Sequence, residues 1–114
     1  MKILEKSRDN IEAVDLYLLT VSPAIETVKN IEDGTSIKVT DWCLFEDTKD
    51  DETTELLSFM TPEKKVYCCQ SKTFKRSFFD IQSLMDSNFT IIKTSGKTKN
   101  GRDFVNCILD VSAL

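Results

Sequence analysis

The segment Thr94–Cys107, TSGKTKNGRDFVNC, contains residues that could bind phosphate groups, because two glycines enclose two lysines and an arginine follows. A P-loop requires a lysine and a hydroxyl residue directly after its second glycine, and it opens a helix. Here Arg102 and Asp103 follow Gly101, and a strand-like segment comes next. The sequence therefore argues against a nucleotidase and leaves two interpretations, a solvated hairpin tip and a clamp for a nucleic-acid backbone.

Positive charge is concentrated in the same third of the chain. Residues 64–102 contain nine cations and two anions, whereas the whole chain has a net charge of −4. Some of these cations fall in the first turns of a predicted helix, where the helix dipole disfavours them, so helix stability does not explain them but an anionic partner would. The candidate phosphate-binding residues are Lys38, Lys65, Lys72, Lys75, Arg76, Lys93, Lys97, Lys99 and Arg102.

Aromatic residues near these cations form the third element of the pattern. Single-stranded nucleic acids bind by stacking bases on aromatic rings beside a cationic track. In an alternating strand Trp42 shares a face with Lys38, Tyr67 follows a pair of lysines, and Phe104 follows Arg102. Trp42, Tyr67 and Phe104 are therefore candidate stacking residues, with Tyr17 a weaker one. The alternative for each ring is core packing, because aromatics supply much of the buried area of a small domain.

Catalytic and metal-binding patterns are missing from the sequence. The chain has no histidine, and no carboxylate pair lies in an apolar setting where a pKa could be tuned. The acidic run 46–55 matches no EF-hand spacing and predicts a solvated hairpin loop. Four cysteines without CxxC spacing favour buried, reduced thiols over disulfides or a zinc site. We expect no enzyme, no metal and no cofactor.

Length and composition indicate one domain over residues 1–114, with 40% hydrophobic residues. No apolar run approaches the roughly 20 residues that cross a bilayer. The N-terminus becomes charged after two apolar residues, which argues against a signal peptide. We expect a cytoplasmic protein that does not bind membranes.

The predicted elements are mostly strands. A helix is expected over residues 71–86, because Phe74, Phe78, Ile81 and Met85 form one stripe, and a short helical turn is expected over 22–28. The expected strands are 13–21, 36–45, 54–60, 65–70, 89–95 and 103–111, with a tight Asn100-Gly101 turn between the last two. This order predicts a mainly β, OB-fold-like Greek-key barrel of five to six strands, with the main helix between the third and fourth core strands. An α+β sandwich is the alternative.

Three motifs carry a family resemblance: Asp33-Gly34-Thr35 opening a strand, VYCCQSKTF leading into the helix, and SGKTKNGRDFVNCILDVS closing the chain. From about Val28 onward the chain resembles the single-stranded DNA-binding proteins of small tailed phages that replicate linear DNA from a protein primer. The resemblance implies an OB-fold that coats single strands during phage DNA replication without sequence preference and without enzymatic activity. Single-stranded DNA is then the expected partner, and replication proteins and a second copy of the chain are further candidates.

The acidic part of the chain supports a rival hypothesis. Net charge −4 and the run Glu46–Glu55 favour a phage-type protein that binds and inhibits a host protein through an acidic face mimicking DNA. The concentration of positive charge between Lys64 and Arg102 favours DNA binding instead.

Overall fold

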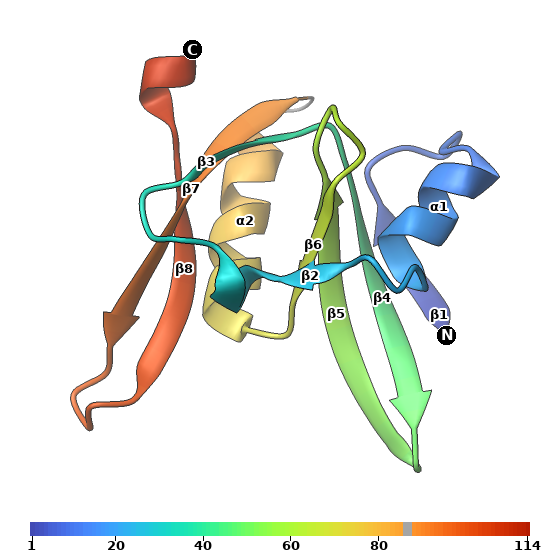
Figure 1. Ribbon diagram of the computed structural model, residues 1–114, viewed down its shortest axis with the longest axis horizontal. Helices are drawn as coiled ribbons and strands as arrows, with labels where there is room; N and C mark the ends of the chain where they lie inside the picture. The colour runs from blue at the N-terminus through green and yellow to red at the C-terminus, as the bar shows by residue number, and fades with distance from the viewer. Residues whose placement is uncertain (86–87) are drawn as a thin grey trace.

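The computed structural model of the protein describes residues 1–85 and 88–114 (Figure 1). Over these residues the fold is mainly β, as the sequence predicted, but it has eight strands in two sheets and two α-helices instead of five to six strands and one main helix. Asp86, the last residue of the predicted helix, lies outside the described residues. No helix in the described part of the chain is long and apolar enough to span a membrane.

Two sheets form the fold. The larger has the strand order β1 (Lys2–Lys6), β4 (Asp41–Lys49), β5 (Glu52–Met60), β6 (Val66–Cys69) and β2 (Glu26–Thr27), in which only the β6–β2 pair is parallel. The smaller sheet is antiparallel, in the order β3 (Ser36–Val39), β7 (Phe89–Lys97) and β8 (Asp103–Leu109). The described pairing joins β8 only to β7, and therefore does not establish a closed barrel.

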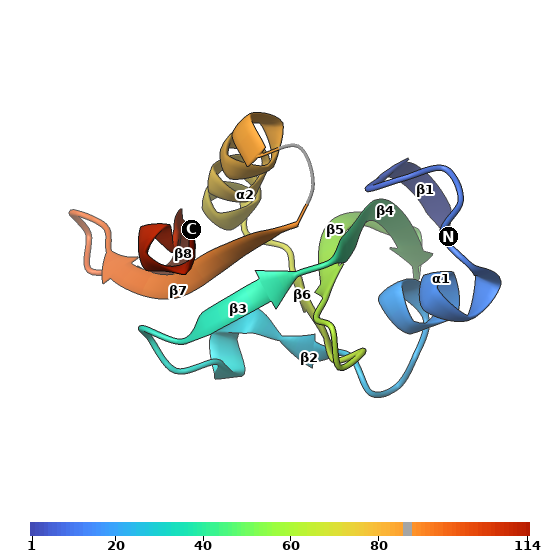
Figure 2. The ribbon, with the colours of Figure 1, turned by 90° about the horizontal axis from the view of Figure 1, so that it is seen from above.

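The chain crosses between the sheets at Thr40, which divides the predicted strand 36–45 into β3 and β4. The Thr40 N–H and hydroxyl both donate to the Met60 carbonyl, at 2.9 and 3.1 Å. One continuous run thus serves both sheets, which lie on either side of the interior when viewed from above (Figure 2).

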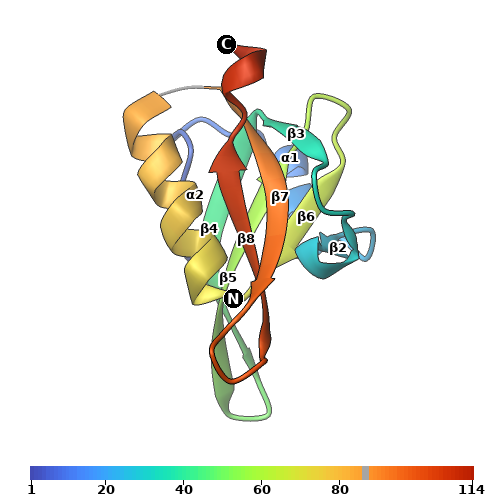
Figure 3. The ribbon, with the colours of Figure 1, turned by 90° about the vertical axis from the view of Figure 1, so that its left-hand side faces the viewer.

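Helix α2 (Lys72–Met85) covers one open side of the space between the two sheets, as Figures 2 and 3 show. It confirms the predicted helix, and the Ser71 hydroxyl caps its start by accepting a hydrogen bond from the Phe74 N–H at 3.2 Å. Phe74 and Phe78 are fully buried beside Phe59, while the rest of the predicted stripe is partly buried. The main core therefore lies between the sheets and consists largely of aromatic side chains.

Helix α1 (Ala13–Thr20) covers the opposite face of the larger sheet, so the prediction of a strand over 13–21 is wrong. Leu19 packs with Cys43 and Met60 in a second core. Asp15, one turn before Leu19, is buried and accepts two hydrogen bonds from the Lys64 ammonium, both at 3.1 Å. Because the segment is apolar almost throughout, its composition did not distinguish a short helix from a buried strand.

The helical turn predicted over residues 22–28 is also wrong. The structure has strand β2 there, followed by a 3-10 turn, η1 (Val28–Asn30). The parallel pairing of β2 with β6 supplies the backbone partners that a helix would have supplied locally. Val28 and Ile31, on either side of this turn, are buried in the main core.

The acidic run 46–55 belongs to strands β4 and β5 rather than to a long loop. Only Asp50 and Asp51 connect these strands, and both have positive φ angles, 52° and 66°. Positive φ at both central residues is typical of a two-residue type I′ turn. The acidic residues therefore lie along a two-stranded hairpin arm, and the prediction of a loop over residues 46–55 is wrong.

The β7–β8 connection is longer than the predicted Asn100-Gly101 turn. Strand β7 ends at Lys97 and β8 begins at Asp103, and within this connection only Gly101 has a positive φ, 78°. The Thr98 N–H donates to the Arg102 carbonyl at 2.9 Å and closes the loop. This five-residue loop carries the cations Lys99 and Arg102 outward.

The end of the chain differs from the predicted strand 103–111. Strand β8 stops at Leu109, and a 3-10 turn, η2 (Val111–Ala113), follows with Val111 exposed. The Asp110 carboxylate ends the strand because it accepts hydrogen bonds from the Ser36 and Ser112 hydroxyls, both at 2.6 Å.

The β4–β5 and β7–β8 hairpins project from the same end of the molecule (Figures 1 and 3). The start of α2 lies at this end as well, and β2 with η1 lies on the other side of the β7–β8 hairpin in Figure 3. An acidic arm and a basic arm therefore flank one end of the fold.

Candidate nucleic-acid interface

Two hollows lie along the β7–β8 hairpin. The first, of about 460 Å³, is bordered by η1, strand β5, strand β6 and β8, and the second, of about 620 Å³, extends along the hairpin itself. We call the pair the trough, because both hollows are lined by Lys29, Asp103, Phe104 and Val105. Cations at one wall and apolar groups from β5 and β6 at the other give it the mixed chemistry that stacked bases and phosphates require.

Phe104 is the aromatic residue of the trough. Its side chain is half-buried, and its ring covers Gly96, the residue directly opposite on β7. The tip of the ring therefore lies over the β7 backbone at Gly96. A half-exposed ring fixed in this way is suited to stacking against a planar ligand.

The cations of the hairpin are mostly exposed. Lys97 forms an ion pair with Asp103 at 2.9 Å, and hydrogen bonding to Asp103 raises the pKa of Lys97. Lys99 and Arg102 make no ion pair with any described residue. Three predicted phosphate-binding residues thus lie on one arm, and the sequence reasoning missed Lys29, which borders the trough together with Lys97.

Lys93 also borders the trough but is buried, with 5% of its surface exposed. Its ammonium donates to Asp33 at 2.7 Å, and the Ser95 hydroxyl donates to the other oxygen of the same carboxylate. The hydrogen bonds from Lys93 and Ser95 hold the pKa of Asp33 below its ordinary value. Lys93 therefore anchors the Asp33-Gly34 turn and offers little free charge to a ligand.

The three predicted phosphate-binding cations of α2, Lys72, Lys75 and Arg76, do not act together in the structure. Lys75 is buried and donates to the Glu55 carboxylate at 2.8 Å and to the Glu55 carbonyl at 3.2 Å, which ties α2 to β5. Lys72 and Arg76 are exposed on the outer side of the helix. Neither lines the trough, so the structure does not bring them together with the hairpin cations.

Trp42 is buried, with 6% of its surface exposed, so its predicted place on a polar face is wrong. Its ring packs edge-to-face against Phe79 and Phe78, at centroid distances of 5.1 and 6.3 Å. The alternating pattern of β4 did not identify a polar face because the larger sheet is covered on both faces. Trp42 points into the main core, and Cys43, the next residue, points into the second core. Trp42 cannot stack on a base in this structure.

Tyr67 is half-buried against Phe59, with ring centroids 5.8 Å apart. The Lys65 ammonium lies 5.4 Å from the Tyr67 ring centroid and 3.7 Å from the Glu26 carboxylate. Lys38 is exposed on β3, opposite Thr90. None of these three predicted site residues borders the trough, and Tyr17 is exposed on α1 on the far side of the larger sheet.

Ion pairing neutralises much of the basic segment. Five of its nine cations pair with carboxylates among the described residues: Lys64 with Asp15, Lys65 with Glu26, Lys75 with Glu55, Lys93 with Asp33, and Lys97 with Asp103. The sequence could not show this, because most of these partners come from distant parts of the chain. The free positive charge of the trough therefore comes from a few residues on one hairpin and from Lys29.

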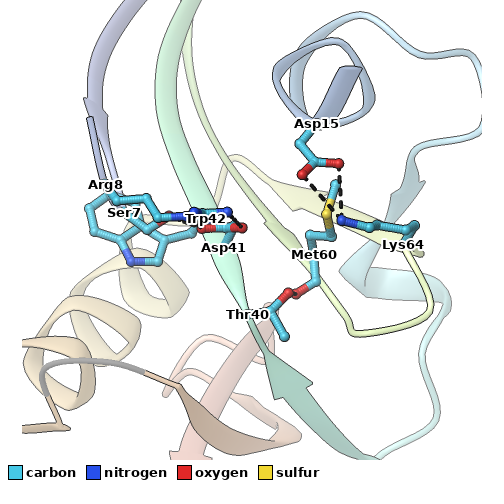
Figure 4. Close-up of polar contacts among 8 residues, drawn as sticks. All are labelled: Ser7, Arg8, Asp15, Thr40, Asp41, Trp42, Met60 and Lys64. Carbon is cyan, nitrogen blue, oxygen red and sulfur yellow. Dashed lines mark hydrogen bonds and ion pairs between the residues drawn. The ribbon is translucent and has the colours of Figure 1, made fainter. Parts of the chain in front are cut away.

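A second polar cluster lies at the end of β1 (Figure 4). Arg8 donates two hydrogen bonds to the Asp41 carboxylate, at 2.9 and 3.0 Å, and the Ser7 hydroxyl donates a third at 2.8 Å. Burial alone would raise the pKa of Asp41, but the hydrogen bonds from Arg8 and Ser7 outweigh it and lower that pKa. Because these contacts satisfy the carboxylate, the cluster serves to fix β1 against β4.

The cysteines agree with the predicted reduced thiols. All four are free, and burial raises the pKa of Cys43 to about 11 and the pKa values of Cys69 and Cys107 to about 12. Such thiols stay protonated at neutral pH and are poor nucleophiles and metal ligands. The described residues contain no cluster of side chains suited to holding a metal ion.

Comparison of the chain with protein-family models, with curated proteins and with solved structures gives no match. The function is therefore argued from the trough and its charges.

Proposed function

We propose that the protein binds single-stranded DNA in the trough and has no enzymatic activity. The observation that carries this proposal is the half-buried Phe104, a residue that borders both hollows on a hairpin whose tip holds Lys97, Lys99 and Arg102. A base stacks on the outer face of the ring while neighbouring phosphates contact the cations of the tip and Lys29. Stacking accepts every base, so the binding has little sequence preference.

The connectivity of the strands supports an OB-related architecture as part of the proposal. The run from β3 through β4 serves both sheets, β5 and β6 follow, and α2 precedes the β7–β8 hairpin. This is the strand and helix order of an OB barrel, in which the connections after the first and fourth strands flank the oligonucleotide. Those connections correspond here to the β4–β5 and β7–β8 hairpins.

The resemblance to phage single-stranded DNA-binding proteins extends the proposal to a biological setting. In that setting the protein coats and protects displaced single strands during phage DNA replication in the host cytoplasm. The closing motif of the resemblance, SGKTKNGRDFVNCILDVS, contains Gly96, Lys97, Asp103 and Phe104, which also border the trough.

Fluorescence anisotropy with a labelled oligothymidine tests the proposal. We expect saturable binding that weakens with salt, and weaker binding to a duplex of equal length, because paired bases cannot stack on Phe104. Equal affinity for single strand and duplex, or no binding to either at low salt, would contradict it.

One observation favours a second candidate function. The β4–β5 hairpin projects beside the trough with exposed Asp47, Asp50, Asp51 and Glu52. A row of carboxylates on a hairpin arm supports binding to a basic surface of a host protein. Reversal of these acids would abolish such binding, whereas oligothymidine binding would stay the same or become tighter.

A further inference from the structure

Strand β8 has a free edge beside the trough. The Asp110 N–H donates to the Thr90 carbonyl at 2.8 Å, and the Thr98 N–H donates to the Arg102 carbonyl at 2.9 Å. In an antiparallel pair, alternate residues bond to the partner strand. With the β7–β8 register, the main-chain groups of Phe104 and Asn106 therefore face β7, and those of Asp103, Val105 and Cys107 face away from it.

The free edge is blocked at Cys107 and open at Val105. At Cys107 the outward N–H donates to the Asn106 side-chain oxygen at 2.9 Å, and the thiol lies 3.9 Å from the Phe74 carbonyl of α2. Val105 and Asp103 lie on the part of β8 that borders both hollows, and no hydrogen bond to a described residue occupies their outward main-chain groups. Unpaired edge groups beside a hollow are a template for adding a strand.

The walls of the trough indicate the composition of the added strand. Val28, Leu56 and Cys68 provide an apolar wall opposite Val105. Lys29, Lys93 and Lys97 line the second hollow, with Asp103 as the one carboxylate among its lining residues, and Lys99 and Arg102 follow in the hairpin loop, so the local charge is positive. A strand with alternating acidic and apolar side chains matches both walls.

We propose that the β8 edge at Asp103–Val105 binds an extended, acidic peptide segment of a partner protein by strand addition. The peptide backbone pairs with Val105, its apolar side chains enter the hollow beside Leu56, and its carboxylates contact Lys29 and the hairpin cations. This goes beyond DNA binding, because it uses the main chain of β8 rather than the Phe104 ring. Since both ligands occupy the trough, the peptide displaces DNA.

An alternating Asp/Leu octapeptide with a fluorescent label is the probe, and hydrogen exchange of the Val105 amide is the direct readout. We expect saturable binding and protection of that amide in the complex. Two control peptides have distinct roles: a version N-methylated at every peptide bond keeps the charge and removes the donors, and a Lys/Leu version reverses the charge. We expect both to bind at least about tenfold more weakly.

Val105→Pro and Val105→Thr form the matched pair of variants. Proline is tolerated at an edge position whose N–H faces away from the sheet, and it removes the proposed donor, whereas threonine keeps it. We expect Val105→Pro to lose about tenfold in peptide affinity relative to Val105→Thr. Equal peptide affinity of the two variants, equal binding of the N-methylated peptide, or an unprotected Val105 amide would overturn the proposal. If the wild-type protein does not bind oligothymidine, the proposed DNA-binding function is wrong, and the result for the peptide still stands.

Discussion

The ring of Phe104 lies so close over Gly96 that a Cβ atom added at Gly96 would be 2.7 Å from the ring Cζ and 3.0 Å from Cε1. The 2.7 Å contact is too short for a real Cβ atom, so the ring would have to move. Gly96 lies within β7 and its φ is not in the left-handed region, so the backbone does not require glycine there. The close approach of the ring is what requires it.

Gly96→Ala should therefore move the Phe104 ring and weaken oligothymidine binding while the fold remains. Base–aromatic stacking contributes about 1–3 kcal/mol per base, so displacement of the ring should cost at least about fivefold in affinity. Thr94→Ala is the matched control, because Thr94 lies on the same strand opposite Asn106 and not opposite an aromatic ring. Unchanged affinity in Gly96→Ala would show that the ring position does not matter for binding.

Trp42 should report on folding and not on DNA. Its emission should stay the same when oligothymidine is added, because the ring is enclosed by Phe78 and Phe79. Trp42→Ala should lower the free energy of unfolding by about 3–5 kcal/mol, as truncation of a buried aromatic does. Phe104→Ala is the contrasting variant, with a smaller loss of stability and a larger loss of binding. Strong quenching of Trp42 by DNA would place it at the interface.

Asp41 should make the stability of the protein depend on pH in the acid range. Its pKa in the folded protein lies below the ordinary value of 3.8, so its ion pair with Arg8 stabilises the fold above that value. This contribution is lost as the pH falls through the lowered pKa. The melting temperature of Asp41→Asn should thus lie below that of the wild type at pH 7, and the gap should narrow on acidification below about pH 4. Asp9→Asn, an exposed acid nearby, is the control, and a gap that is constant with pH would contradict the assignment.

Local patterns in the sequence predicted the parts of the fold that depend on local chemistry. The α2 stripe at Phe74 and Phe78 is specific to a helix, and the alternating residues of β7 and β8 are specific to strands. The segment 13–21 was mistaken for a strand because it is apolar almost throughout, and such a run does not distinguish a short helix from a buried strand. No local pattern reveals that it covers a sheet whose other face is also buried. The same covering of both faces hid the burial of Trp42.

The candidate site was predictable only in part. The basic hairpin and Phe104 were identified from spacing and residue type. Lys75 and Lys93 were assigned to phosphate because their partners, Glu55 and Asp33, are 20 and 60 residues away in the chain. Lys29 was missed because it follows β2, whose parallel pairing with β6 brings it to the trough. Nothing in its local sequence indicates this.

The salt dependence of binding should reflect the small number of free cations. If Lys29, Lys97, Lys99 and Arg102 each contact a phosphate, the slope of log K against log salt concentration should be about −2.8, at roughly 0.7 per contact. Lys99→Ala should reduce the slope by about 0.7. Lys75→Ala should leave the slope unchanged, because Lys75 is already paired with Glu55. A slope that is flat, or equally sensitive to both changes, would contradict this assignment of the contacts.

Charge reversal of the basic arm tests the DNA-binding trough most directly. We would measure oligothymidine affinity at moderate salt for the triple variant Lys97→Glu, Lys99→Glu and Arg102→Glu. The control triple variant is Lys2→Glu, Lys6→Glu and Lys38→Glu, which makes the same change in net charge on β1 and β3, at residues that do not border the trough. The proposed trough predicts that the first variant loses measurable binding, because phosphate contacts are replaced by repulsion within about one Debye length, while the control binds within a few-fold of the wild type. Equal affinities of the two folded variants would show that the β7–β8 hairpin is only a solvated tip and that DNA does not bind in the trough.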